Sequence, residues 1–139
     1  RRSIQINQIG MKMSKRVLVT GGAGFIAHHV IEHIIRTTDW NIVCLDRLDF
    51  SGNLNRLADV MQDFGVEDRK RVEVVYHDLK AEINPLISSM IGDVHVVLHL
   101  AAGSHVDRSI EYSCRVPIAQ CIGQCIAQRI AHHSILCSI

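Results

Sequence analysis

A glycine-rich turn stands where an apolar run gives way to a helical pattern. The chain reads Thr-Gly-Gly-Ala-Gly-Phe-Ile-Ala there, which places Gly21, Gly24 and Ala27 at the spacing G-x-x-G-x-x-A. Gly21 permits a tight turn, Gly24 lets a ligand approach the backbone, and Ala27 keeps the following helix close to the strand. Phosphates would bind the free N–H groups at the positive end of that helix. The pattern predicts a site for the pyrophosphate of a dinucleotide.

A carboxylate ends the second apolar run of the chain, at Asp46. In an open parallel sheet this side chain would lie beside the glycine turn and could accept both hydroxyl groups of the adenosine ribose. The same charge would repel a 2′-phosphate, which favours NAD over NADP, although the adjacent Arg47 leaves a phosphate contact open. Asp78 follows the third apolar run and could accept a hydrogen bond from the adenine amine; a solvated turn aspartate is the alternative. NAD is therefore the predicted cofactor.

Strands and helices alternate from Arg16 onward, and this order would position the turn and the two acids. Apolar runs predict strands over 16–20, 41–46, 72–76 and 94–100. Helical periodicity predicts helices over 25–36 and 53–64, and a third helix capped by Asn84, opened by Pro85 and ended by Gly92. The residues predicted to face inward include Ile26, Ile34, Leu54, Leu57, Leu86, Ile87, Met90 and Ile91.

This alternation predicts an α/β fold with right-handed crossovers. We expect a Rossmann-type parallel sheet with helices on both faces, truncated after about four strands. The fourth strand would then be an open edge. The expected domain organisation is a disordered lead-in over 1–15, a dinucleotide-binding half over 16–112, and an atypical tail over 113–139.

Composition excludes several classes of function. A net charge of +1 gives no reason to expect nucleic acid as a partner. No apolar run reaches the ~18 residues that span a bilayer, and the first residues hold no apolar block of a secretory signal, so we expect a cytoplasmic protein without membrane contact. An odd number of cysteines, 5, argues against a disulfide framework.

No metal site is predicted. His95 and His99 share one face of the fourth predicted strand without carboxylates or thiols at ligand spacing, and they are interpreted as packing histidines. Cys121-x-x-x-Cys125, followed by His132 and His133, matches no standard zinc spacing.

The stretch Leu-His-Leu-Ala-Ala-Gly-Ser-His-Val-Asp-Arg-Ser-Ile, from Leu98 to Ile110, is the most specific of the chain. Together with the glycine turn, the Leu45-Asp46 strand end and the Asp78-Leu79 pair, it resembles the extended short-chain dehydrogenase/reductase family. Within that family the similarity is to the nucleotide-sugar dehydratases and epimerases, above all the dTDP-glucose 4,6-dehydratases. Ala27 stands where glycine is more common. The resemblance covers about 16–111.

The resemblance implies roles for individual residues. The implied cofactor-binding residues are Gly21, Gly24, Phe25, Ile26, Asp46, Asp78, Leu79, Ala101 and Ala102. Ser104, His105 and Val106 would face the nicotinamide and a nucleotide-sugar substrate, although Ser104 could equally do no more than cap a helix. The resemblance also implies a homodimer for the full-length parent.

The family's catalytic tyrosine and lysine, four positions apart on a helix after the fifth strand, have no counterpart at that place. The one match to the spacing, Tyr76 and Lys80, crosses the end of a predicted strand, and no catalytic residue is predicted. After Tyr112 acidic and aromatic residues vanish. A helix is possible there, starting near Pro117, but our hypothesis is an aberrant, frameshifted or misspliced translation.

The predicted function is the NAD-binding N-terminal part of a nucleotide-sugar 4,6-dehydratase, inactive alone. A part of a 4-epimerase, a non-catalytic NAD-binding module and a non-functional product are the alternatives.

Overall fold

The computed structural model describes residues 14–48, 53–101 and 135–138. They form a 5-stranded parallel sheet in the order β3-β2-β1-β4-β5. The strands are β1 Arg16–Thr20, β2 Asn41–Asp46, β3 Val72–Tyr76, β4 Val96–His99 and β5 Ile135–Ser138. The helices are α1 Ala27–Thr37, α2 Leu54–Gln62, α3 Val66–Arg69 and α4 Pro85–Ile91. The predicted Rossmann-type α/β fold is confirmed.

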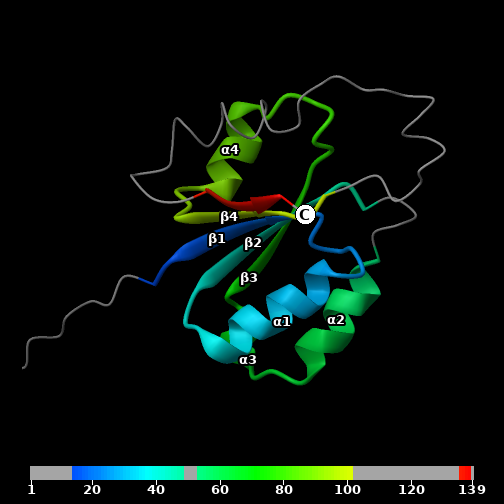
Figure 1. Ribbon diagram of the computed structural model, residues 1–139, viewed down its shortest axis with the longest axis vertical. Helices are drawn as coiled ribbons and strands as arrows, with labels where there is room; N and C mark the ends of the chain where they lie inside the picture. The colour runs from blue at the N-terminus through cyan, green and yellow to red at the C-terminus, as the bar shows by residue number, and fades with distance from the viewer. Residues whose placement is uncertain (1–13, 49–52, 102–134, 139) are drawn as a thin grey trace, which may run out of the picture.

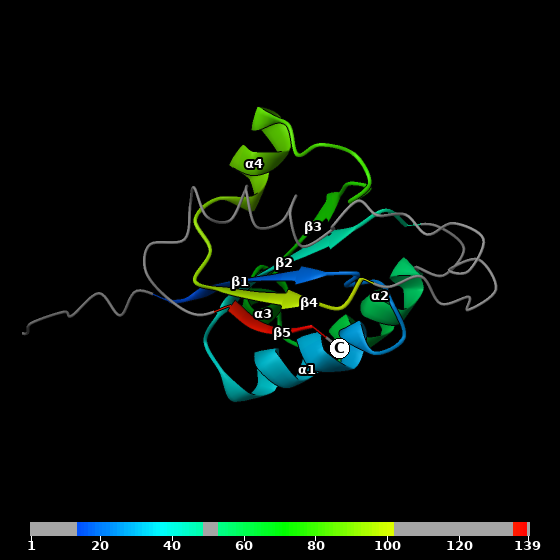
Figure 2. The same ribbon diagram turned by 45° about the horizontal axis from the view of Figure 1, so that its top comes forward.

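Helices cover both faces of this sheet. Figures 1 and 2 show α1, α2 and α3 on one face and α4 on the other. The chain runs outward from β1 to β3 and then crosses back through α4 to place β4 on the other side of β1. The strand order therefore reverses between β1 and β4. Ligands of open parallel sheets bind outside the carboxyl ends of the strands at such a point.

Alternating side chains of the strands supply two apolar cores. Val17, Val19, Ile42 and Cys44 pack with α1 on one face. On the α4 face the core is formed by Leu18, Val43, Leu45, Val75, Leu79, Ile91, Val94 and Val97. Strands buried on both faces explain the nearly continuous Val/Ile/Leu runs of the sequence.

The fifth strand arises from the predicted tail. β5 is parallel to β4, with Val97 opposite Ile135 and His99 opposite Ser138. The prediction that β4 is an open edge is therefore wrong, because β5 pairs with it. The helix considered near Pro117 lies outside the described residues.

Local signals set the helix ends as expected in α4. The Asn84 side chain accepts a hydrogen bond of 2.9 Å from the Ile87 N–H, Pro85 opens the helix, and Gly92 ends it with a φ of +67°. The short helix α3 was not predicted, because four residues are too few to show a helical period.

Some inward-facing residues were predicted wrongly. Ile26 precedes the first turn of α1 and is exposed, as are Leu54, Leu86 and Met90. A seven-residue helix meets a sheet along a narrow stripe, and in α4 Ile87 and Ile91, four positions apart, form that stripe. No helix within the described ranges combines the length and the hydropathy needed to cross a membrane.

Candidate functional site

The glycine turn joins β1 to α1 at the carboxyl edge of the sheet. Gly21 has a φ of +69°, in the left-handed region, and its N–H donates to the Leu45 carbonyl of β2 at 2.8 Å. The Gly24 N–H donates to the Gly21 carbonyl at 2.9 Å and closes the turn. A Cβ on Gly21 would lie 2.7 Å from the Cα of Ala101. Backbone conformation and a close neighbour thus both require glycine, and the predicted tight turn is present.

Asp46 points its carboxylate at this turn. One oxygen, Oδ2, accepts a hydrogen bond of 2.9 Å from the Ala23 N–H. The other, Oδ1, accepts one of 2.8 Å from the Leu48 N–H, and Leu48 has a φ of +53°, uncommon for a side chain of its size. A carboxylate offers about four lone-pair positions, so both oxygens retain acceptor capacity for a ribose. Both oxygens nonetheless have a structural role that sequence reasoning did not foresee.

A second glycine of the turn has a role that sequence reasoning missed. A Cβ on Gly22 would collide with the Sγ of Cys44, which is buried in β2 beneath the turn. Burial, with a smaller contribution from the nearby charge of Asp46, raises the pKa of the Cys44 thiol to about 12. The thiol is therefore protonated at neutral pH and packs against the turn as a small apolar side chain.

The first turn of α1 offers its backbone to a ligand. No side chain among the described residues caps it, and Phe25 and Ile26, which precede the helix, are exposed. A Cβ on Gly24 would approach the Gly21 carbonyl at 3.0 Å, and apart from the neighbouring residues in the chain no other described atom lies within 4 Å of it. This side of the turn is consequently open, and a phosphate could reach the positive end of the helix.

Asn53, which immediately precedes α2, also binds to the glycine turn. The Asn53 N–H donates to the Ala23 carbonyl at 3.1 Å, and the Asn53 side chain caps α2 by accepting from the Asn55 N–H. Ala23, which has no exposed surface, is thereby bound on one side by Asp46 and on the other by Asn53.

Asp78 and Leu79 follow β3 at the same edge of the sheet. The Asp78 carboxylate accepts a hydrogen bond of 3.0 Å from the Lys80 N–H and lies 3.8 Å from Nη1 of Arg47. It is therefore a turn residue whose side chain is 42% exposed. The Leu79 side chain is buried in the core on the α4 face, so only its main chain could meet a ligand.

The end of β4 completes the edge. The Leu100 N–H donates to the Thr20 carbonyl at 3.1 Å, and Ala101 lies against Gly21. The structure thus brings Gly21, Asp46 and Ala101 together from the ends of three neighbouring strands. Ala102, Ser104, His105 and Val106 lie outside the described residues, and their roles stay predictions.

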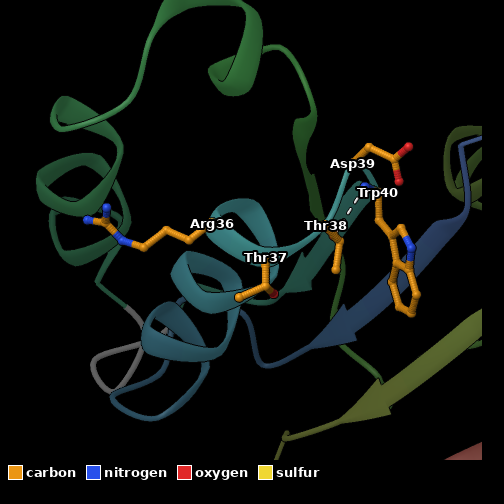
Figure 3. Close-up of a pocket in the computed structure, with 5 residues that line it drawn as sticks. All are labelled: Arg36, Thr37, Thr38, Asp39 and Trp40. Atoms are coloured by element: carbon orange, nitrogen blue, oxygen red, sulfur yellow. Dashed lines mark hydrogen bonds between the residues drawn. The ribbon is translucent and has the colours of Figure 1, made fainter.

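A shallow pocket at the opposite edge of the sheet does not bring reactive groups together. It is lined by Arg36, Thr37, Thr38, Asp39 and Trp40, between the end of α1 and the start of β2. Figure 3 shows the Arg36 side chain pointing away from Trp40.

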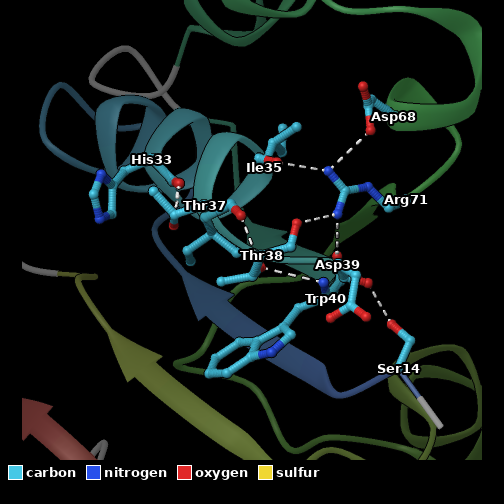
Figure 4. Close-up of polar contacts among 10 residues, drawn as sticks. Ser14, His33, Ile35, Thr37, Thr38, Asp39, Trp40, Asp68 and Arg71 are labelled. Carbon is cyan, nitrogen blue, oxygen red and sulfur yellow. Dashed lines mark hydrogen bonds and ion pairs between the residues drawn. The ribbon is translucent and has the colours of Figure 1, made fainter. Parts of the chain in front are cut away.

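Polar contacts beside that pocket serve to end α1. The guanidinium of Arg71 donates to the Thr38 carbonyl at 2.7 Å and to the Ile35 carbonyl at 2.8 Å, and pairs with Asp68 at 3.0 Å (Figure 4). An arginine immediately before β3 thus binds carbonyl groups that the end of a helix leaves free.

Comparison with known proteins agrees with the geometry at the carboxyl edge. The sequence profile of a family described as GDP-mannose 4,6 dehydratase matches residues 18–125. The chain belongs to the GDP-mannose 4,6 dehydratase family. The match extends past Tyr112, so it includes the first residues of the predicted tail.

Relatives of this chain are known both by sequence and by crystal structure. A dTDP-glucose 4,6-dehydratase of Neisseria gonorrhoeae is 43% identical over 96 residues, which cover 69% of this chain and 26% of the relative. One of Salmonella typhimurium is 40% identical over 97 residues, 68% of this chain and 25% of the relative.

A crystal structure of a dTDP-glucose 4,6-dehydratase from Streptomyces venezuelae with NAD bound matches with a TM-score of 0.66 at 31% identity, over 82% of this chain and 36% of that one. The chain spans about a quarter of the length of these curated relatives. The predicted resemblance to the nucleotide-sugar dehydratases is confirmed.

Proposed function

We propose that this chain is the NAD-binding part of a nucleotide-sugar 4,6-dehydratase. The observation that carries the proposal is the carboxylate of Asp46, buried at the end of β2 and bound to the Ala23 N–H of the glycine turn. A turn with an open helix end and an acid beside it is what a dinucleotide needs for its pyrophosphate and its adenosine ribose. Relatives that match this chain include several dTDP-glucose 4,6-dehydratases, and one such enzyme was crystallised with NAD.

The residues at the carboxyl edge fit the shape and charge of NAD. The N–H groups at Phe25 and Ile26 would bind the pyrophosphate, and Asp46 would bind the ribose hydroxyls. Asp78 and the Leu79 main chain would meet the adenine, and Ala101, which lies beside the turn, would line the path toward the nicotinamide. When bound, NAD supplies the hydride acceptor for oxidation of a sugar hydroxyl.

The reaction proposed for the full-length protein is oxidation at C4 of a nucleotide-linked hexose, loss of water across C5–C6, and return of the hydride at C6. We propose that this chain alone binds NAD without turnover. Tyr76, whose spacing to Lys80 resembles the family's catalytic pair, is the last residue of the strand β3 and points into solvent with 66% exposure. A nucleotide-sugar substrate, a homodimer and a cytoplasmic location stay predictions for the full-length protein.

Isothermal titration calorimetry with NAD tests the proposal directly. We expect saturable binding to the unaltered chain, weaker binding of NADP, and no measurable binding to Gly21→Ala, whose Cβ would collide with the Ala101 backbone. Gly65→Ala is the matched control, because nothing lies within 4 Å of its added Cβ. A flat trace for the unaltered chain, with circular dichroism showing that it is folded, would contradict the proposal.

A further inference from the structure

Thr20 and His99 form a polar pair directly beneath the glycine turn. They are register partners at the carboxyl ends of β1 and β4, and Thr20 Oγ1 lies 2.6 Å from His99 Nδ1. Thr20 has no exposed surface and His99 is half-buried. A short polar contact in a buried place has a large effect on local rigidity, because few water molecules compete with it.

The partners of the Thr20 hydroxyl determine where its proton lies. The Ala101 N–H donates to Thr20 Oγ1 at 3.4 Å, so one lone pair is occupied. Within residues 14–48 and 53–101, Nδ1 of His99 is the acceptor in reach of the single hydroxyl proton. If the hydroxyl donates to Nδ1, the imidazole must carry its proton on Nε2. Burial lowers the pKa of His99, which favours the neutral ring that this arrangement requires.

The same pair lies next to the groups that shape the cofactor turn. Thr20 precedes Gly21, its carbonyl accepts from the Leu100 N–H at 3.1 Å, and Gly21 touches the Ala101 backbone. A chain of two polar contacts thus runs from the imidazole of His99 through the Thr20 hydroxyl to the Ala101 amide. Its effect is to fix the distance between the ends of β1 and β4, where the strand order reverses.

We propose that His99 is a positioning residue for the cofactor. Its Nδ1 accepts the Thr20 hydroxyl proton, and the oriented hydroxyl holds the Ala101 amide against the Gly21 turn. The inference rests on the proposed function, because it assumes that this turn binds NAD. It differs from the packing role predicted for His99 from the sequence, since packing alone requires neither a given tautomer nor a hydroxyl at position 20.

Nuclear magnetic resonance of the side-chain nitrogens tests the arrangement without any cofactor. A proton–nitrogen correlation spectrum of the unaltered chain, assigned with His99→Asn, is expected to show His99 as the neutral tautomer with its proton on Nε2. The Ala101 amide is expected to exchange with solvent at least tenfold more slowly than in Thr20→Val. A proton on Nδ1, or equal exchange in the two proteins, would overturn the proposal.

Affinity for NAD, measured by calorimetry, tests the positioning role. Thr20→Val keeps the shape of the side chain and removes the hydroxyl, whereas Thr20→Ser keeps the hydroxyl. His99→Leu removes the acceptor, whereas His99→Asn retains an oxygen near the place of Nδ1. We expect the Val and Leu variants to bind NAD about tenfold more weakly, and the Ser and Asn variants to remain within about twofold of the unaltered chain.

His95→Asn is the matched control at the other end of β4, where Nδ1 of His95 accepts the Arg16 N–H at 3.1 Å. It should leave NAD affinity unchanged. Equal affinity of Thr20→Val and the unaltered chain, or equal weakening by His95→Asn, would overturn the positioning role. A folded, unaltered chain without NAD binding would instead overturn the proposed function, and the spectrum would still show whether the two contacts of the Thr20 hydroxyl exist.

Discussion

The backbone N–H of Ala23 donates a hydrogen bond of 2.9 Å to the carboxylate of Asp46, across the gap between the glycine turn and the end of β2. Ala23 has no exposed surface, and Asp46 is 8% exposed, so water does not substitute for this contact. Family resemblance assigns Asp46 to the ribose of a cofactor. The structure adds that the same side chain holds the turn in place before any cofactor arrives.

Replacing Asp46 should therefore reduce stability as well as cofactor binding. In Asp46→Asn, the side-chain oxygen can accept from only one of the two backbone N–H groups, Ala23 or Leu48. The side-chain NH2 group would face the other N–H, which would be left without an acceptor. We expect the free energy of unfolding in urea to fall by about 2 kcal/mol and NAD affinity to fall at least tenfold. Asp59→Asn, an exposed change on α2, is the control and should alter neither. Unchanged stability of Asp46→Asn would show that the carboxylate does not support the turn.

Gly22 and Cys44 should behave as a coupled pair in stability measurements. Gly22→Ala places a Cβ against the buried sulfur, and overpacking of this kind costs about 1–3 kcal/mol. Cys44→Ala removes the sulfur and leaves a small cavity. The double variant should regain much of the loss caused by Gly22→Ala, which a double-mutant cycle from urea unfolding would measure. Strictly additive effects would mean that the two side chains do not compete for this space.

The reactivity of Cys44 should depend on unfolding. Its pKa is raised to about 12 from 9.0, so the folded chain keeps the thiol protonated where the unfolded chain would lose the proton. The contribution of the Cys44 thiol to the free energy of unfolding is thus fully present below pH 9.0 and decreases as pH rises toward 12. At pH 8 iodoacetamide should label the peptide containing Cys44 only after urea is added, as detected by mass spectrometry. Rapid labelling of the folded chain would contradict this.

His99 should make stability sensitive to mild acid. Burial lowers its pKa from 6.5, so as pH falls through 6.5 the unfolded state takes up a proton before the folded state does. The free energy of unfolding should therefore decrease as pH falls below 6.5. The chain has 9 histidines, and the comparison with His99→Asn isolates this one. Urea titrations between pH 5 and 7.5 should show a shallower dependence in the variant; parallel curves would contradict the expectation.

Arg71 should contribute to stability without contributing to the cofactor site. Its guanidinium binds the Ile35 and Thr38 carbonyls at the far edge of the sheet from Gly21. Hydrogen bonds from a charged group contribute about 1.5–3 kcal/mol, so Arg71→Ala should lower the free energy of unfolding by about 2–3 kcal/mol. NAD affinity at a temperature where the variant is folded should stay unchanged. A large loss of affinity would indicate that the two edges of the sheet are coupled.

The framework of the fold could be predicted because local signals determine it. The strands 16–20, 41–46 and 72–76 have the predicted bounds, since each is an apolar run ended by a glycine or a polar residue. Asn84 and Gly92 similarly set the ends of α4. Gly21 was identified as the turn residue because its place between a strand and a helix is visible in the sequence.

Contacts between distant segments could not be predicted in the same way. That Gly22 faces Cys44 depends on how closely the turn lies over β2. The pairing of Thr20 with His99 depends on the register of β1 and β4, which no local pattern reveals. The exposure of Ile26 depends on where α1 begins, and periodicity alone placed that start two residues too early.

Leu48, after β2, and Asn53, at the start of α2, are both attached to the turn region, Leu48 through Asp46 and Asn53 through Ala23. Both hydrogen bonds join this region to the glycine turn, so a displacement of the turn would also shift the exit from β2 and the start of α2. An engineered change at the turn should consequently be judged by its effect on all three elements, β1, β2 and α2, and not on the turn alone.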